Sequence, residues 1–238
     1  WEKIQQEREN LPNLKYVVLM SGAASVDDPM VLTWDDFLAR SDEVDDSLVD
    51  ERIAVLEPNK TATLIYTSGT TGPPKGVMLT HENLAWTATI AQGLVGLRSH
   101  DCVLSYLPLS HIAEQLFSIH GPVALGFEVY FSEGLEKLKE NLVEAKPTVF
   151  FGVPRIWEKF YTALSAKLAM ATGTKAKLVA WARGVGGRVH AKKNAGQGVG
   201  IVLGLQYKLA SRLIFSKVLG ALGFDETRYF VSGAAPVS

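Results

Sequence analysis

The fold and the chemistry of this chain are indicated most clearly by residues 62–76, which read ATLIYTSGTTGPPKG. The first six of these residues are mostly β-branched, aliphatic or aromatic, and this composition predicts a strand. From Thr67 onwards the sequence becomes a loop, and residues 67–76 contain four serine or threonine side chains, three glycines and Lys75. Glycines let backbone N–H groups approach an anion closely, hydroxyls add neutral donors, and lysine adds a charge suited to phosphate. The loop is therefore predicted to bind a polyphosphate.

The spacing of this loop differs from that of the P-loop of nucleoside triphosphatases. In that motif a glycine is followed by four residues and then by Gly-Lys-Ser/Thr. Counted from Gly69, the second glycine would fall at Pro74, and Gly76 follows Lys75 where a hydroxyl residue should stand. The alternative interpretation is a plain Gly/Pro turn with incidental hydroxyls. A plain turn needs neither four hydroxyls nor a lysine, which favours the phosphate-binding interpretation.

Outward from this loop, short apolar strands alternate with longer helical stretches. Unpunctuated apolar strands in such an alternation are typical of a parallel sheet that is buried on both faces. The predicted fold class is therefore α/β, a layered parallel β-sheet with helices on both faces. The predicted strands are residues 16–20, 62–67, 103–106, 128–131, 148–151 and 228–231, and the predicted helices are residues 80–97, 110–116, 135–145, 155–171 and a region up to about 222.

Several element boundaries can be predicted from capping and breaking residues. Thr33 should cap a short helix, and Thr80 should begin a longer one. Ser110 is expected to cap the helix that follows the third strand, and Gly121-Pro122 is expected to interrupt that helix. The acidic residues 41–51 are predicted to form a surface connection.

Composition excludes several classes of protein. The chain has 238 residues, of which 47% are hydrophobic and 21% charged, a composition that is typical of a globular protein and not of a disordered one. Its one cysteine, Cys102, has no internal disulfide partner and is expected in the core. No apolar run reaches the roughly 20 residues that span a bilayer, and the segment after Trp1 does not resemble a signal peptide. We therefore expect a cytoplasmic, soluble segment of a longer protein.

The net charge of −1 conceals an asymmetry along the chain. Residues 1–60 contain 14 acids and 6 bases, whereas residues 155–217 contain 12 bases and one acid. This basic block is either a solvated helical face or a surface for phosphates or anionic lipid. Nucleic acid is not an expected partner, because no zinc, RNP-like or helix-turn-helix pattern accompanies the charge. The densest bases, interleaved with apolar residues as in a membrane-surface helix, are Lys175, Lys177, Arg183, Arg188, Lys192 and Lys193.

Several of these segments resemble the adenylate-forming superfamily, which comprises acyl- and aryl-CoA synthetases, luciferases and peptide-synthetase adenylation domains. Residues 66–76 resemble its signature loop, and residues 105–115 (SYLPLSHIAEQ) resemble the next motif in its long-chain acyl-CoA synthetase form. Residues 152–159 (GVPRIWEK) are similar to the segment that follows, and residues 232–236 (SGAAP) to the nucleotide-pocket turn. The basic helical insertion, about 172–222, resembles that of the bubblegum-like long-chain fatty acid–CoA ligases.

The resemblance implies a domain organisation and a reaction. Residues 1–238 would be the central part of the large N-terminal AMP-binding domain, without the C-terminal domain. A long-chain fatty acid would attack the α-phosphate of ATP bound with Mg²⁺, which gives acyl-adenylate and pyrophosphate; CoA would then displace AMP. An anionic membrane surface would be a peripheral partner.

The resemblance also assigns site residues. His111 matches the position that borders the acyl carboxylate, although it is alternatively a histidine in the first turn of a helix. A tryptophan gates the acyl tunnel of some relatives at the place of Gln115, whereas Trp157 is expected in the core. The residues that would hold the β- and γ-phosphates are Thr67, Ser68, Gly69, Thr70, Thr71, Gly72 and Lys75. The turn that would lie beside the adenine is Gly233, Ala234, Ala235 and Pro236. Alternatively, this second group is a plain turn at the end of a strand.

Other family motifs do not occur in these residues. They are the segment whose glutamate binds Mg²⁺, the segment that holds the ribose, the hinge and the catalytic lysine. No metal ligand is predicted in the chain, and we expect the full-length parent to be active and this chain alone to be inactive. Two alternatives stay open: an enzyme that passes acyl-adenylate to a carrier protein, and a non-catalytic nucleotide- or acyl-binding module.

Overall fold

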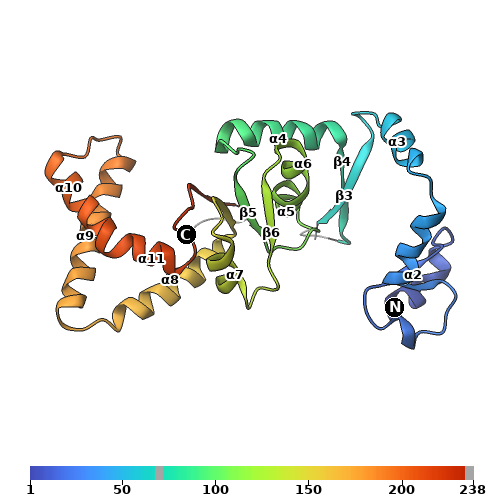
Figure 1. The fold of residues 1–238 in the computed structure, drawn as a ribbon, viewed down its shortest axis with the longest axis horizontal. Helices are drawn as coiled ribbons and strands as arrows, with labels where there is room; N and C mark the ends of the chain where they lie inside the picture. Colours follow the sequence, from blue (N-terminus) through green and yellow to red (C-terminus); the bar gives the residue numbers. More distant parts are fainter. Residues whose placement is uncertain (68–71, 234–238) are drawn as a thin grey trace. The chain divides into compact units, whose positions relative to one another are not determined.

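A computed structural model of the chain describes residues 1–67 and 72–233 (Figure 1). Contacts within the chain divide it into two compact units, Trp1–Glu57 and Pro58–Ser238. The assignment of all 238 residues to the middle of one larger domain stays a prediction.

The first unit is built around a short parallel strand pair, β1 and β2. Thr33 caps helix α2 as predicted, because its Oγ1 accepts a hydrogen bond from the backbone N–H of Asp36 at 3.0 Å. The prediction of a plain connection over 41–51 was wrong in part: the Asp45 carboxylate accepts from the N–H of Ser47 at 2.8 Å, and a helix begins there. The elements are α1 (Glu2–Glu7), η1 (Arg8–Asn10), β1 (Val17–Leu19), η2 (Ala23–Ser25), β2 (Val31–Thr33), α2 (Trp34–Ala39), η3 (Arg40–Glu43) and α3 (Ser47–Ala54).

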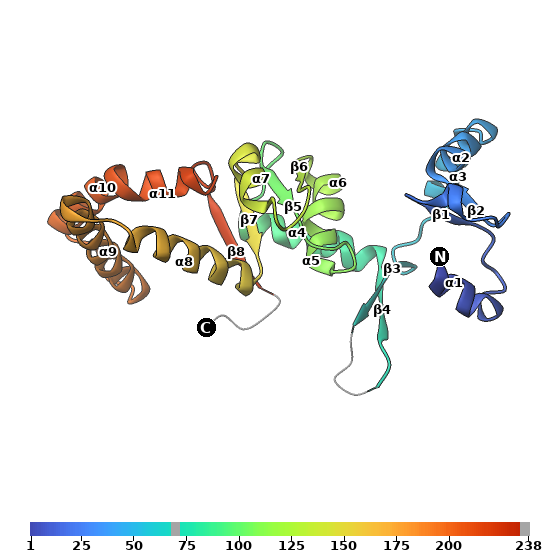
Figure 2. The same cartoon turned by 90° about the horizontal axis from the view of Figure 1, so that it is seen from below.

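The second unit begins with an antiparallel hairpin of β3 (Thr61–Thr67) and β4 (Lys75–Thr80), which run side by side in Figure 2. The predicted strand over 62–67 is thereby confirmed, but β4 was not predicted. Helix α4 (His81–Val95) follows directly, and its start is closed by a capping box between Thr80 and Asn83. Strand β4 and helix α4 therefore form one continuous segment after the predicted phosphate-binding loop.

Four strands of this unit form two parallel pairs that lie next to each other. Strand β5 (Cys102–Ser105) pairs in parallel with β6 (Glu128–Phe131), and β7 (Val149–Gly152) pairs in parallel with β8 (Tyr229–Ser232). The two pairs meet where the N–H of Thr148 donates to the carbonyl of Cys102 at 2.9 Å, so β5 and β7 lie side by side. The carboxyl ends of these strands consequently share one edge.

Alternate residues of the central strands point to opposite layers of helices. On one face Leu104 and Phe150 pack with Leu142 of α7 (Leu138–Ala145) and Ile156 of α8 (Pro154–Ala169). On the other face Val103 and Val149 pack with Leu97, Phe117 and Phe127, which belong to the segment from α4 to β6. The predicted class, a parallel sheet with helices on both faces, is thus confirmed. Trp157 packs against the first layer, and its Nε1 donates to the carbonyl of Gly152 at 2.8 Å.

The predicted helix boundaries between β5 and β6 were wrong. The helix is capped by His111 instead of Ser110, and it is not interrupted at Gly121-Pro122. It continues from α5 (Ile112–Gln115) through a π-helical turn, η4 (Leu116–His120), into α6 (Gly121–Leu125). The wider π turn precedes the proline and gives its ring the room that a regular helix would not. Gly121 fits there because a Cβ would lie 2.8 Å from the ring of Phe127.

The basic segment after α8 is helical, as predicted. It contains α9 (Gly173–Asn194), α10 (Ile201–Ala210), the π-helical turn η5 (Ser211–Phe215) and α11 (Ser216–Ala221). Its helices pack around Ala182, Val185 and Ala210. Across the two described ranges, we find no helix with the length and apolar character that crossing a membrane requires.

Candidate functional site

The β3–β4 hairpin brings two of the predicted phosphate-binding residues together. Thr67 and Lys75 are cross-strand partners at the end of the ladder, and Thr67 Oγ1 donates to the carbonyl of Lys75 at 3.5 Å. Both residues are exposed, and Gly72 adopts φ +100°, a conformation that favours glycine. Residues 68–71, which include Ser68, Gly69, Thr70 and Thr71, lie outside the described residues.

The next residue pair along the hairpin explains why a glycine follows the lysine. Gly76 is the cross-strand partner of Tyr66, and a Cβ at Gly76 would lie 3.3 Å from two carbons of the tyrosine ring. Gly76 therefore allows the ring of Tyr66 to lie across the opposite strand next to Lys75. Sequence reasoning counted this glycine among the anion-binding features, whereas the structure gives it a packing role.

His111 lies at the start of α5, on the loop that follows β5. Its Nδ1 accepts a hydrogen bond from the N–H of Ala113 at 3.2 Å, so the imidazole caps the helix. With Nδ1 acting as acceptor, the neutral ring carries its proton on Nε2. His111 therefore begins the helix, as in the alternative interpretation, and its place beside the acyl carboxylate stays a prediction, for which Nε2–H is available as a hydrogen-bond donor.

Glu114, whose role the sequence did not reveal, anchors the loop that carries His111. It is only 3% exposed, and it accepts hydrogen bonds from the hydroxyl of Ser105 at the end of β5, from the hydroxyl of Ser118 at 2.6 Å, and from the N–H of Leu107 at 3.2 Å. A charge inside an otherwise apolar helix pattern was the signal that could have identified it. These contacts tie the end of β5 and the start of the loop to the α5–η4 segment through one carboxylate.

Gln115, at the place where the resemblance implied a gating tryptophan in some relatives, also holds this loop. Its Nε2 donates to the carbonyl of Leu109 at 2.8 Å, and its Oε1 lies 3.4 Å from Nε2 of His120. Burial lowers the pKa of His120, which favours its neutral form. Gln115 therefore links the loop at Leu109 to His120 through polar contacts of its side chain.

A cavity of about 280 Å³ lies between α4 and the α5–η4 segment, next to the His111 loop. It is close to the lower limit of roughly 300 Å³ for ligand pockets. Ile112 and Ala113, the residues directly after His111, contribute to its wall. Most of the wall is apolar; its lining residues are Leu79, Asn83, Leu84, Thr87, Ile112, Ala113, Leu116 and His120.

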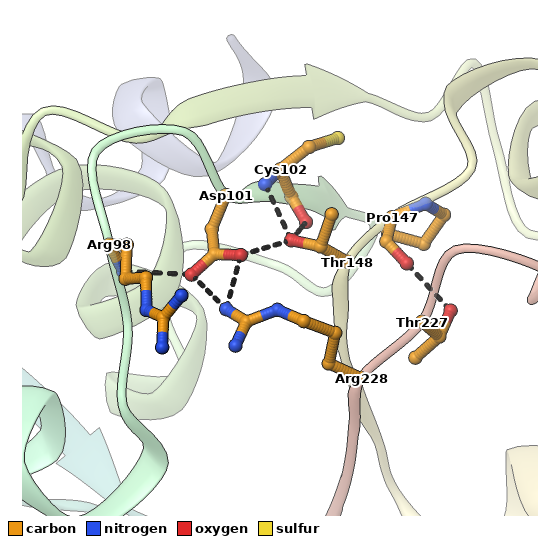
Figure 3. A network of polar contacts seen from close by, with 7 residues as sticks. All are labelled: Arg98, Asp101, Cys102, Pro147, Thr148, Thr227 and Arg228. Carbon is orange, nitrogen blue, oxygen red and sulfur yellow. Dashed lines mark hydrogen bonds and ion pairs between the residues drawn. The ribbon is translucent and has the colours of Figure 1, made fainter.

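A buried polar network joins the amino ends of the strands (Figure 3). Asp101 is fully buried, and its carboxylate accepts from the hydroxyl of Thr148 at 2.6 Å, from Nη2 of Arg228 at 2.6 Å and from the N–H of Arg98 at 2.8 Å. Burial raises the pKa of Asp101, but these hydrogen bonds and the charge of Arg228 outweigh burial and hold the pKa below its usual value. The network sets the relative position of β5, β7 and β8.

At the opposite, carboxyl edge Tyr106 joins the ends of β5 and β7. Its hydroxyl donates to the carbonyl of Phe151 at 3.1 Å and accepts from the N–H of Val153 at 3.3 Å, and burial raises the pKa of Tyr106 to about 12. Gly233 follows β8 at this edge, where a Cβ would be 3.5 Å from the ring of Phe151. The other residues of the predicted adenine turn, Ala234, Ala235 and Pro236, lie outside the described residues.

The His111 loop and Gly233 thus follow strands whose carboxyl ends share an edge, where open α/β sheets bind ligands. The hairpin residues Thr67 and Lys75 are not joined to them by any hydrogen bond or ion pair within the described part of the chain. In that same part, no group of three or more His, Cys, Asp or Glu residues could hold a metal ion. Cys102 is buried as expected, and burial raises the pKa of its thiol to about 11.

Comparison with known proteins places this arrangement in a family. The profile of the AMP-binding enzyme family matches residues 2–238. The chain belongs to the AMP-binding enzymes. This match confirms the resemblance to the adenylate-forming superfamily that the signature loop and the SYLPLSHIAEQ segment indicated.

Curated proteins are similar over most or all of the chain. The long-chain-fatty-acid–CoA ligase ACSBG2 of Xenopus laevis is 40% identical over 245 residues, covering 100% of this chain and 33% of that protein. The human ACSBG2 is 42% identical over 211 residues, covering 87% and 31%, and the human ACSBG1 is 35% identical over 244 residues, covering 99% and 33%. The chain therefore spans about a third of the length of these relatives. The expected bubblegum-like branch is confirmed by these names.

A solved structure shares the fold of this chain. The adenylation domain of a carboxylate reductase from Mycobacterium chelonae superposes with a TM-score of 0.58, covering 100% of this chain and 30% of that one, at 20% sequence identity. At this identity the likeness concerns the fold alone.

Proposed function

We propose that the full-length parent of this chain activates a long-chain fatty acid with ATP and transfers the acyl group to CoA. The observation that carries the proposal is membership of the AMP-binding enzymes together with 40% identity over the whole chain to a relative named long-chain-fatty-acid–CoA ligase. Because the chain spans about a third of that relative, the activity is proposed for the parent.

In this proposal the β3–β4 hairpin holds the leaving pyrophosphate. Thr67 offers a hydroxyl and Lys75 a flexible, exposed ammonium at the two strand ends that flank the loop. Their charge and hydrogen bonds would neutralise the β- and γ-phosphates and orient the α-phosphate for attack. That contribution is positioning and electrostatic stabilisation, and it requires no covalent chemistry from the protein.

His111 would orient the fatty acid. Because Nδ1 is engaged by the N–H of Ala113, the ring presents Nε2–H, which can donate a hydrogen bond to one oxygen of the substrate carboxylate. The other oxygen is then left to attack phosphorus. The three hydrogen bonds of Glu114 would keep the loop, and therefore this imidazole, in one place.

The apolar cavity beside Ile112 and Ala113 would receive the acyl chain next to that carboxylate. Leu79, Leu84 and Leu116 line it, so each methylene that enters leaves water for an apolar environment, worth about 0.8 kcal/mol. Its volume of about 280 Å³ suits part of a long chain. The remainder would extend into the rest of the parent.

Mg²⁺ and CoA belong to the proposal for the parent. Mg²⁺ would arrive with ATP and neutralise charge on the phosphates, as this ion is usually held by substrate oxygens and one or two carboxylates. The uncharged hydroxyls of the signature loop can lie next to such an ion without repelling it. The carboxylate that binds the ion is expected in the rest of the parent protein. A cytoplasmic parent would meet its poorly soluble substrate at a lipid surface.

The experiment is a product analysis with the purified full-length parent. Hexadecanoate, ATP and Mg²⁺ should support exchange of pyrophosphate into ATP, and addition of CoA should give acyl-CoA by mass spectrometry. Exchange without acyl-CoA formation would favour transfer to a carrier protein, and no exchange would favour a non-catalytic module. The isolated 238 residues should show no exchange; robust exchange by them would contradict the expected need for the other motifs.

A further inference from the structure

Helix α10 presents an apolar face to solvent. Ile201, Val202, Leu205 and Leu209 are 85%, 72%, 65% and 51% exposed. Their spacing of one, four and eight residues places all four on one side of the helix, within an arc of about 100°. We call these four residues the α10 face.

The opposite side of α10 holds this face in a fixed position. Leu203, Tyr207 and Ala210 pack against Ala182 and Val185 of α9, and α9 and α10 lie side by side in Figure 1. The apolar residues of α9 are consequently buried by packing against the neighbouring helices. Sequence reasoning had considered α9 itself as a membrane-surface helix, but the apolar surface that remains exposed belongs to α10.

Basic side chains border the α10 face on both sides. Arg188 of α9 donates from Nη2 to Oε1 of Gln206 at 3.4 Å, and Lys192 follows Arg188 one helical turn later. On the other side Lys208 lies three residues after Leu205 and is exposed. Residues 173–221 contain nine bases and no acid, and none of these bases has an ion-pair partner in the described part of the chain.

We propose that the α10 face docks on an anionic phospholipid surface, with Arg188, Lys192 and Lys208 at the level of the headgroups. An apolar stripe between bases is the pattern of helices that lie in the membrane interface. The apolar side chains would enter the boundary of the acyl region, and the bases would bind anionic headgroups. This inference concerns a surface remote in sequence from the hairpin and His111, and it does not depend on which reaction the parent catalyses.

Charge distinguishes this occupant from a second copy of the chain. A symmetric pair of α10 faces would place Arg188, Lys192 and Lys208 of one copy close to the same bases of the other. Like charges in such an interface repel, whereas an anionic bilayer attracts them. The binding should be reversible and should weaken as salt screens the headgroup contacts.

The experiment measures binding of the full-length parent to vesicles by flotation. One set of vesicles is phosphatidylcholine, and the other is phosphatidylcholine mixed with phosphatidylserine. We expect binding to the mixed vesicles, and a partition coefficient about a hundredfold lower for Leu205→Ser/Leu209→Ser, since two leucines lose most of their apolar transfer energy. Leu94→Ser is the matched control, because Leu94 is 81% exposed on α4 and should leave binding within about twofold of wild type.

The charge arm compares two pairs of lysines. Lys192→Gln/Lys208→Gln should reduce binding to the mixed vesicles about thirtyfold, at about 1 kcal/mol per headgroup contact. Lys175→Gln/Lys177→Gln, in the first two turns of α9, should reduce it less. Equal effects of the two pairs, equal binding to both vesicle types, or no binding by the wild type would overturn the proposal.

A labelling measurement tests whether something else covers the α10 face. Iodoacetamide should modify Leu205→Cys rapidly in the parent without vesicles, and mixed vesicles should slow that modification, as read on the peptide containing residue 205. Slow modification without vesicles would mean that another part of the parent, or a second copy, occupies the face. That result would also refute membrane docking.

Discussion

Asp101→Asn should loosen the sheet at its amino edge. The carboxylate is fully buried and receives hydrogen bonds from Thr148, Arg228 and the N–H of Arg98. Asparagine keeps the shape, but it removes the charge that faces the guanidinium and replaces one acceptor oxygen with an NH₂ group. Loss of a charge-assisted hydrogen bond at a buried group costs about 2 kcal/mol. That cost corresponds to about a thirtyfold change in the local opening equilibrium.

The assay is amide hydrogen exchange of the full-length parent, read on the peptides that contain β5, β7 and β8. Exchange of these amides should be about thirtyfold faster in Asp101→Asn, because opening of this region governs their protection. Asp225→Asn is the matched control: it breaks the exposed pair with Lys146, whose side chains are 37% and 44% exposed. Exposed pairs contribute little, so the control should change exchange by less than about twofold.

The pH dependence of stability provides a second test of the role of Asp101. The pKa of Asp101 lies below that of the unfolded chain, so its contribution to stability is complete above about pH 4 and is lost as the pH falls through the lower folded pKa. The difference in apparent Tm between wild type and Asp101→Asn should therefore shrink below about pH 4. Equal hydrogen exchange in wild type and Asp101→Asn, or a Tm difference that grows on acidification, would refute the assigned role.

Three further outcomes can be measured on the same protein. Glu114→Gln supplies an NH₂ group that cannot accept all three hydrogen bonds, so fatty-acid-dependent pyrophosphate exchange should slow by about tenfold, and an unchanged rate would separate the loop from catalysis. Gly223→Ala should lower the apparent Tm more than Gly196→Ala. Both glycines have positive φ, but a Cβ at Gly223 would lie 2.1 Å from the carbonyl oxygen of Leu142, whereas a Cβ at Gly196 would meet no atom within 4 Å. The thiol of Cys102, with a pKa of about 11, should react with iodoacetamide at pH 8 about a hundredfold more slowly in the native parent than in urea, and comparable rates would contradict its burial.

The parts of the fold that sequence reasoning predicted correctly are those with strong local signals. The run of β-branched and aromatic residues at Glu128–Phe131 forms β6 with the predicted bounds. Thr80 and Asn83 cap α4 through their own side chains, so no distant residue is needed. The hydroxyls, glycines and lysine around Lys75 likewise identified the signature loop, which the family match bears out.

The features that were missed depend on distant partners. Strand β4 contains the mixed sequence Lys75–Thr80, and it forms because β3 supplies its hydrogen bonds. The helix continues past Pro122 because a π-helical turn precedes it, which local rules do not anticipate. Asp101 acquires its role from Arg228, 127 residues away, and the α10 face is recognised only once α9 has taken up the other side of the helix.

The central claim is that the β3–β4 hairpin binds phosphate during adenylation. The most direct measurement is the initial rate of fatty-acid-dependent pyrophosphate exchange by the full-length parent with Lys75→Ala, beside Lys167→Ala on α8 as the matched lysine control. We expect a rate about ten- to a hundredfold lower for Lys75→Ala at unchanged fatty acid affinity, and a wild-type rate for the control. An exchange rate and an ATP dependence equal to those of the wild type in Lys75→Ala would contradict the claim and make the loop a structural turn.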